Sequence, residues 1–177
     1  MKTVLITGCS SGIGLDAAHF LRGRGWRVIA TCRKPEDIAA RRAEGFEVLH
    51  LELGDEDSVA RCAEQALAMG PIDALVNNGA FAIPGAVEDL PRGALRSIFE
   101  TNLFGTHDLT RQFLPHFRQH GGRVVNVSSV LGLAGIPWRG AYVATKFALE
   151  GLTDVLRVEM ADTPVKVVLI EPGPIGT

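Results

Sequence analysis

The stretch TGCSSGIG (7–14) places glycine at positions 8, 12 and 14, directly after a short apolar run and before a helical pattern. Glycine permits a tight turn, lets backbone approach a phosphate group, and lets the helix pack closely on the strand. The free N–H groups and the positive dipole end of the helix favour an anion. The strand–turn–helix context therefore predicts a dinucleotide-binding turn rather than an ordinary glycine-rich loop.

Short β-branched runs alternate with longer helical patterns along the rest of the chain. The six runs cover residues 2–7, 26–32, 46–52, 72–78, 122–128 and 165–171. They are nearly continuous in apolar residues, which is typical of strands buried on both faces of a parallel sheet. The alternation predicts an α/β fold of the Rossmann type, a doubly wound parallel sheet between two layers of helices, as a single domain over 1–177.

Apolar residues between these runs recur at helical spacing and predict three buried helix faces. The faces consist of Val59, Ala63, Ala66 and Leu67; of Leu109, Phe113 and Phe117; and of Leu149, Leu152 and Leu156. We expect the last helix to bury Val143 and Phe147 as well.

Composition and charge narrow the classes of protein that fit this chain. Of 177 residues, 46% are hydrophobic and 21% charged, which indicates a globular protein. A net charge of −2 with scattered basic residues gives no reason to expect a nucleic-acid partner or an anionic membrane. No apolar run approaches about 18 residues, so we expect no membrane span. Cys9, Cys32 and Cys62 lack metal-ligand spacing, which favours reduced thiols in a cytoplasmic protein without a metal.

The only tyrosine of the chain lies in GAYVATKFALEG (140–151), four residues before a lysine. This spacing puts Tyr142 and Lys146 on one helix face. A phenol with a pKa near 10 is a poor base at neutral pH. We expect the lysine ammonium to favour the phenolate and lower the pKa of the tyrosine. Taken alone, such a pair is also typical of an ordinary helix surface.

Several motifs in order give the chain its resemblance to a known family. They are the glycine-x3-glycine-x-glycine loop, NNGA (77–80), TNLFG (101–105), NVSSVLG (126–132), YVATK (142–146) and PGPIGT (172–177). Together they resemble the short-chain dehydrogenases/reductases, most of all members that act on retinol and hydroxysteroids with NADP. The resemblance implies an oxidoreductase that moves a hydride between a nicotinamide cofactor and a small-molecule alcohol, ketone or aldehyde.

The resemblance also implies roles at the reacting end of the site. Tyr142 would be the acid/base, and Lys146 would tune it and bind the nicotinamide ribose. Ser129 would hold the substrate oxygen where negative charge shifts. It lies thirteen residues before Tyr142 (142 − 129 = 13), as the family serine does, and Ser128 remains the alternative. Asn102 would hold a water molecule that links the lysine to solvent.

The end of the second predicted strand bears on which nicotinamide cofactor is bound. Cys32 stands where an NAD-binding chain usually has an acid for the ribose 2′-OH, and Arg33 and Lys34 follow it. A cationic fork there suits a 2′-phosphate. This favours NADP(H) over NAD(H), although a solvated basic turn also fits the pattern.

Further cofactor contacts follow from the resemblance alone, and these include Tyr142 and Lys146. Glu52 and Leu53 would flank the adenine, and Thr177 would contact the nicotinamide carboxamide. The remaining residues expected to touch the cofactor are Gly8, Ser10, Ser11, Gly12, Ile13, Gly14, Asn77, Asn78, Gly79, Pro172, Gly173 and Ile175.

Relatives in this family continue through a helical lid and a seventh strand after the PGPIGT motif. We therefore expect a C-terminally incomplete domain with its sixth strand at an exposed edge, and turnover by this chain stays open. The resemblance also implies a homodimer or homotetramer formed through helices near 101–118 and 140–161. A cofactor-binding sensor or scaffold without turnover is the alternative from another class. Sugar epimerases or dehydratases fit less well, since their glycine loop differs.

Overall fold

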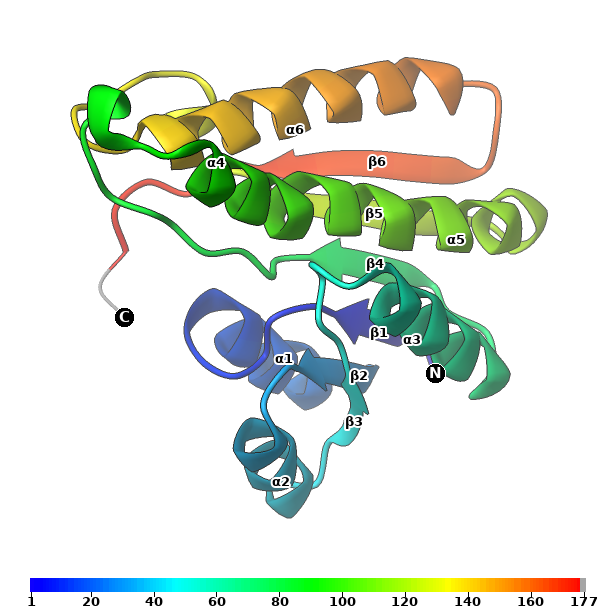
Figure 1. The fold of residues 1–177 in the computed structure, drawn as a ribbon. Helices are drawn as coiled ribbons and strands as arrows, with labels where there is room; N and C mark the ends of the chain where they lie inside the picture. The colour runs from blue at the N-terminus through cyan, green and yellow to red at the C-terminus, as the bar shows by residue number, and fades with distance from the viewer. Residues whose placement is uncertain (176–177) are drawn as a thin grey trace.

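The computed structural model describes residues 1–175 as a six-stranded, fully parallel sheet in the order β3-β2-β1-β4-β5-β6 (Figure 1). The strands are β1 (Thr3–Ile6), β2 (Arg27–Cys32), β3 (Glu47–His50), β4 (Ala74–Asn77), β5 (Gly122–Val127) and β6 (Val165–Ile170). Each lies inside the apolar run that predicted it, so the expected strands and doubly wound fold are confirmed. β6 lies at one edge of this sheet, as expected.

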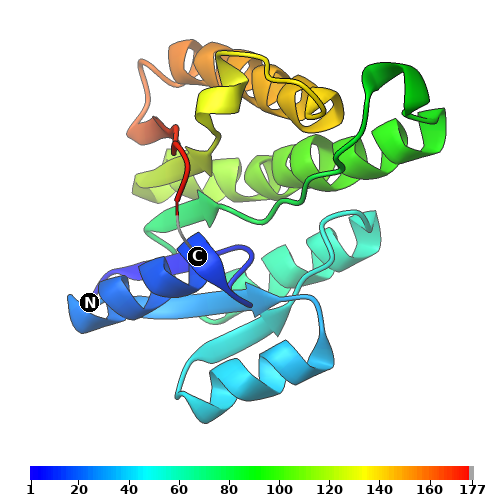
Figure 2. The ribbon, with the colours of Figure 1, turned by 90° about the vertical axis from the view of Figure 1, so that its left-hand side faces the viewer.

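Helices cover both faces of the sheet (Figures 1 and 2). They are α1 (Gly12–Gly23), α2 (Pro35–Ala43), α3 (Glu56–Ala68), α4 (Arg92–Phe99), α5 (Thr106–His120) and α6 (Gly140–Glu159), with the short turns η1 (Val87–Asp89), η2 (Glu100–Gly105) and η3 (Val130–Gly132). α1 and α2 pack on one face, whereas α3, α5 and the end of α6 pack on the other. None of the helices described over 1–175 is both long and apolar enough to cross a bilayer.

Strand residues alternate between two apolar clusters, one on each face of the sheet. In β1, Val4 and Ile6 join the cluster under α1 and α2, and Leu5 joins the cluster under α3 and α5. Phe113 and Phe117 of α5 are fully buried in the second cluster. Burying such a side chain stabilises the fold by about 1.5–3 kcal/mol. Burial on both faces explains the continuous apolar runs in the sequence.

The buried stripe of α6 differs from the one expected. Phe147 and Leu152 are 47% and 45% exposed, so the prediction that they are buried is wrong. Leu149 is buried as predicted, and the helix also turns Thr145 and Thr153 inward. The two threonine hydroxyls donate to carbonyl oxygens of their own helix, at 2.8 and 2.6 Å. Because these hydroxyls are satisfied locally, threonine can occupy a buried position and leave apolar side chains outside.

The order of the strands creates a crevice beside β1. The chain runs outward from β1 to β3 and then returns to β4 on the other side of β1. Ligands of open α/β sheets bind at such a switch point, beyond the carboxyl ends of the strands. The glycine loop follows β1 and the NNGA motif follows β4, so both flank this crevice.

Candidate active site

Three adjoining cavities form one groove along the carboxyl ends of the strands. The first, of about 160 Å³, lies over β2 and β3, and the second, of about 270 Å³, lies over the glycine loop. They share Gly8, Ser10 and Gly79. The third, of about 380 Å³, contains Tyr142 and shares Asn78 with the second. The groove can therefore hold an extended ligand from β3 to α6.

The glycine loop fits against the segment after β4 with no room for side chains. Gly8 and Gly12 have φ of +73° and +59°, conformations that favour glycine. A Cβ added at Gly8 would lie 2.8 Å from the Cα of Gly79. A Cβ at Gly14 would collide with the carbonyl oxygen of Gly8. The three glycines are thus needed for the turn and for the close approach of the helix.

Hydrogen bonds tie this loop to the segment after β4. Asn78 Nδ2 donates to the carbonyl oxygens of Thr7 and Gly8 at 3.0 and 3.2 Å. The Thr7 hydroxyl accepts from the backbone N–H groups of Asn78 and Gly79 at 2.9 and 2.8 Å. At the start of α1, Ser11 makes no side-chain cap and the first turn holds no acid. The first N–H groups of α1 lack intrahelical partners, so the middle of the groove suits an anion such as a pyrophosphate.

The cavity over β2 and β3 carries an exposed cation. Arg33 lines it and is 60% exposed, with Nη1 3.5 Å from the Glu52 carboxylate. Cys32 and Leu53 also line this cavity. Lys34 does not line the cavity, because its ammonium turns toward Glu36 at 3.9 Å. Of the two predicted cations, only Arg33 reaches the groove in this structure.

The cavity at the other end brings together most residues predicted for the reacting end. It is lined by Ile13, Asn78, Ala80, Phe81, Ala82, Val127, Ser128, Ser129, Tyr142, Lys146, Pro172, Gly173 and Ile175. The predicted contact Thr177 lies outside the described residues. Ile13 of α1 and Tyr142 of α6 come from segments far apart in the chain, so the fold itself creates the cluster.

Lys146 is buried beneath the phenol ring. It is 3% exposed, its Nζ donates to the Val127 carbonyl oxygen at 2.7 Å, and it lies 5.5 Å from the centre of the Tyr142 ring. Burial lowers the pKa of Lys146 to about 8, and the nearby Glu150 carboxylate opposes this effect. A lysine with such a pKa changes charge close to physiological pH.

The pKa of Tyr142 departs from the expected direction. Burial raises it above the usual value of 10.0, and a hydrogen bond with Ser129 opposes the rise. The expectation that Lys146 lowers this pKa is wrong for the structure as described. The ammonium is directed at the Val127 carbonyl rather than at the phenol oxygen, so desolvation of the phenolate dominates.

Two neighbouring serines face the cavity in different ways. The Ser129 hydroxyl accepts from the backbone N–H of Leu131 at 3.1 Å and is near enough to Tyr142 to oppose the rise in its pKa. Ser128 Oγ is buried and has no hydrogen-bond partner among the described residues. This influence on the pKa of the tyrosine favours Ser129 as the partner of Tyr142.

Asn102 supports the cavity wall from behind. It lies in η2, a π-helical segment between α4 and α5, a type of element common at functional sites. Its amide makes two hydrogen bonds with the backbone of Phe81, at 2.8 and 3.0 Å, and one with the Thr145 hydroxyl at 3.3 Å. Asn102 therefore fixes the loop after β4 against α6.

Asn77 does not reach the groove. Its side chain is buried on the α5 face of the sheet, where Nδ2 donates to Thr110 Oγ1 at 2.9 Å and to Asn126 Oδ1 at 2.8 Å. The side chain of Asn77, a predicted cofactor contact, therefore does not line the groove. Successive side chains of a strand point to opposite faces, so Asn77 and the groove-lining Asn78 point in different directions.

No group of three potential metal ligands occurs among the described residues.

The sequence pattern did not predict the parts played by Thr7, Phe81 and Arg41. Arg41 reaches the glycine loop from α2. Thr7 ends the first apolar run, and its hydroxyl beside the glycine loop could have indicated this role from the sequence. No local pattern marks Arg41.

Curated relatives match nearly the whole chain but extend beyond its length. An uncharacterized oxidoreductase, YbbO, of Escherichia coli (strain K12) is 44% identical over 179 residues, which cover 99% of this chain and 66% of the relative. Retinol dehydrogenase 8 of Homo sapiens is 38% identical over 188 residues, covering 99% and 60%. The chain thus spans about two thirds of the length of these relatives.

Solved structures share the fold closely. A short-chain dehydrogenase from Streptomyces avermitilis superposes with a TM-score of 0.95 at 38% identity, covering 99% of this chain and 66% of the other. An alcohol dehydrogenase from Thermococcus sibiricus, in complex with 5-hydroxy-NADP, gives 0.92 at 27% identity, covering 100% and 78%. The family model for short chain dehydrogenases matches residues 2–177. With this match and these relatives, the chain belongs to the short-chain dehydrogenase family of oxidoreductases.

Proposed function

We propose that the protein is an NADP(H)-dependent oxidoreductase that interconverts an alcohol and its carbonyl compound, with Tyr142 as acid/base. The observation that carries this proposal is the cavity shared by Tyr142, Lys146 and Ser129, which opens into the groove at the glycine loop. A proton-transfer group there lies beside the position that an extended dinucleotide bound along the groove would reach.

The groove fits a dinucleotide along its length. Arg33, Glu52 and Leu53 would hold the adenosine end, and the start of α1 would hold the pyrophosphate. Lys146, with Ile175 and other cavity-lining residues, would hold the nicotinamide end. When bound, the nicotinamide supplies the hydride donor or acceptor. The Thermococcus sibiricus structure with an NADP derivative supports this fit.

The protein's own residues would manage the proton and the substrate oxygen. Burial raises the pKa of Tyr142, so its phenol is protonated at neutral pH, the form that donates a proton to a carbonyl oxygen. Ser129 would hold the same oxygen by a hydrogen bond as negative charge moves onto it. Lys146 would restore the proton, and a pKa of about 8 suits it to that exchange near neutral pH. Asn102 would keep the cavity wall in place.

The proposed substrate is an apolar alcohol, ketone or aldehyde. Retinol dehydrogenase 8 and an estradiol 17-beta-dehydrogenase 1 from Rattus norvegicus are among the relatives, and their names denote apolar alcohols.

We also propose that copies of the chain pair through α5 and α6. Support comes from a groove of about 280 Å³ between these helices, lined in part by Leu152, and from the exposed apolar surface of Leu152 and of Phe147 on α6, which a second copy would cover. Sedimentation that shows only monomer would contradict the pairing.

Calorimetric titration of the chain with NADPH and with NADH tests the proposed cofactor. Tighter binding of NADPH is expected. Tighter binding of NADH would make the protein an NAD(H)-dependent member of the family, and binding of neither would overturn the proposed function for this chain. Binding without turnover on a panel of apolar alcohols and aldehydes would favour a cofactor-binding sensor or scaffold.

A further inference from the structure

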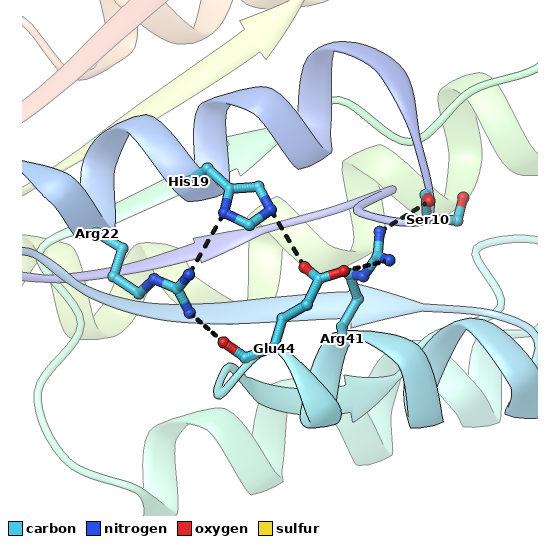
Figure 3. Close-up of polar contacts among 5 residues, drawn as sticks. All are labelled: Ser10, His19, Arg22, Arg41 and Glu44. Carbon is cyan, nitrogen blue, oxygen red and sulfur yellow. Dashed lines mark hydrogen bonds and ion pairs between the residues drawn. The ribbon is translucent and has the colours of Figure 1, made fainter.

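Arg41 reaches from α2 back to the glycine loop. Its Nη1 donates to the carbonyl oxygen of Ser10 at 3.2 Å, and its Nη2 pairs with the Glu44 carboxylate at 2.6 Å (Figure 3). The side chain is only 13% exposed, and Nε is buried without a hydrogen-bond partner among the described residues. Burying a cation is costly unless it is paired, and here the pairing is with Glu44 and the loop backbone.

Glu44, the ion-pair partner of Arg41, is itself bound to α1, the helix that follows the glycine loop. His19 Nε2 lies 3.1 Å from the Glu44 carboxylate, and Arg22 Nη1 donates to the Glu44 backbone oxygen at 2.7 Å (Figure 3). The end of α2 is therefore tied to the side of α1. Because Glu44 is held there, Arg41 contacts the loop from a supported position.

The loop is thus held by donors from two sides. Asn78 binds the carbonyl oxygens of Thr7 and Gly8 from the β4 side, and Arg41 binds that of Ser10 from the α2 side. With its carbonyl groups bound to these donors, the loop keeps the free N–H groups at the start of α1 available to a phosphate. Ser10 lines the groove, whereas Arg41 is absent from the lining of the groove's three cavities.

We propose that Arg41 is a positioning residue for the pyrophosphate of a bound dinucleotide and acts through the Ser10 carbonyl rather than by contact with the nucleotide. The inference rests on the proposed function. NADPH and NADH carry the same pyrophosphate, so Arg41 supports both equally. Arg33 instead lines the cavity over β2 and β3. There it would discriminate between the two nucleotides through the 2′-phosphate.

The test compares Arg41→Met with Arg42→Met. Arg42 is the next residue of α2 and donates to the Val48 carbonyl oxygen at 3.2 Å, away from the loop, so it is a matched control. Calorimetry is expected to show about tenfold weaker binding of both NADPH and NADH to Arg41→Met, with their ratio unchanged. Adenosine 2′-monophosphate, which has the 2′-phosphate and no pyrophosphate, should bind Arg41→Met as tightly as the original chain. Arg42→Met should leave all three affinities unchanged.

Two results would overturn the inference while the proposed function stands. They are unchanged binding of both dinucleotides to Arg41→Met, and a loss confined to NADPH and adenosine 2′-monophosphate, which would mean direct contact with the 2′-phosphate. If thermal unfolding shows that Arg41→Met is not folded, the variant Glu44→Gln tests the inference in its place. It removes the charge that fixes Arg41 and should weaken both dinucleotides by about threefold, and no change would overturn the inference. Failure of the original chain to bind either dinucleotide would instead overturn the proposed function.

Discussion

The two ends of the groove are built in opposite ways. Over β2 and β3, Arg33 is largely exposed and makes an ion pair of 3.5 Å with Glu52. Around Tyr142, the polar groups of Lys146 and Asn102 are buried and bound to backbone oxygens. Exposed ion pairs contribute about 0–1 kcal/mol because water and salt screen them. Buried groups carry a desolvation cost and are held in fixed geometry.

This difference means that the end proposed for recognition and the end proposed for chemistry should tolerate substitutions to different degrees. An exposed arginine can adjust to a ligand, and its loss should change preference rather than folding. At the buried end, burial shifts the pKa of Lys146 down and that of Tyr142 up. Changes there should therefore alter chemistry, stability and pH dependence together.

Tyr142→Phe should give the largest effect, because it removes the proposed proton donor from the buried end. We expect turnover to fall by about 10²–10⁴-fold, the usual contribution of general acid–base catalysis. Binding of NADPH should stay within about twofold, since only the hydroxyl is removed. Steady-state kinetics and calorimetry measure the two. A variant with unchanged turnover would remove Tyr142 from the mechanism.

Lys146→Met should remove a pH dependence of stability. The lysine pKa falls from 10.5 to about 8 in the folded protein, so its contribution to stability is complete above pH 10.5 and is lost as the pH falls through about 8. The difference corresponds to about 3 kcal/mol. Relative to the variant, the original chain should therefore gain stability between pH 8 and 10.5.

Urea unfolding of both proteins from pH 7 to 9.5 checks this prediction. Burial raises the pKa of Cys9 and Cys62 to about 12, so the thiols cost stability as the pH rises past their ordinary value of 9.0. Both proteins contain these thiols, and their effect cancels in the difference. Parallel stability curves would show that Lys146 is not a buried titrating group.

Gly14→Ala should destabilise the loop that joins the two ends. Its Cβ would collide with the Gly8 carbonyl and lie 2.5 Å from Asn78 Nδ2, which we expect to cost about 1–3 kcal/mol. Gly23→Ala, on the same helix, meets nothing within 4 Å and should be neutral or stabilising by about 0.5–1 kcal/mol. Thermal unfolding compares the pair. Equal midpoints would contradict the close fit at Gly14.

Arg33→Met should give the smallest effect, at the exposed end. We expect NADPH binding to weaken by about three- to tenfold and NADH binding to stay unchanged, because an exposed charge–phosphate contact is partly screened. Lys34→Met serves as the control, since Lys34 points away from the groove toward Glu36. An equal loss for both nucleotides would end the proposed role of Arg33 in cofactor preference.

The sequence by itself determined the strands, the motifs that follow the strand ends, and the family. Apolar runs buried on both faces, and glycines beside a strand, leave local patterns that need no knowledge of distant contacts. The spacing of Tyr142 and Lys146 likewise fixed their shared helix face. These features depend on residues within a few positions of one another.

Only the tertiary structure decided which side chains reach the groove. Asn77 faces α5, Lys34 turns to Glu36, and Arg41 approaches the loop from 31 residues away. It also exposed Phe147 and raised the pKa of Tyr142. Each outcome depends on how helices pack on the sheet and on how much water they exclude. Such long-range burial and pairing leave no signal in the spacing of nearby residues.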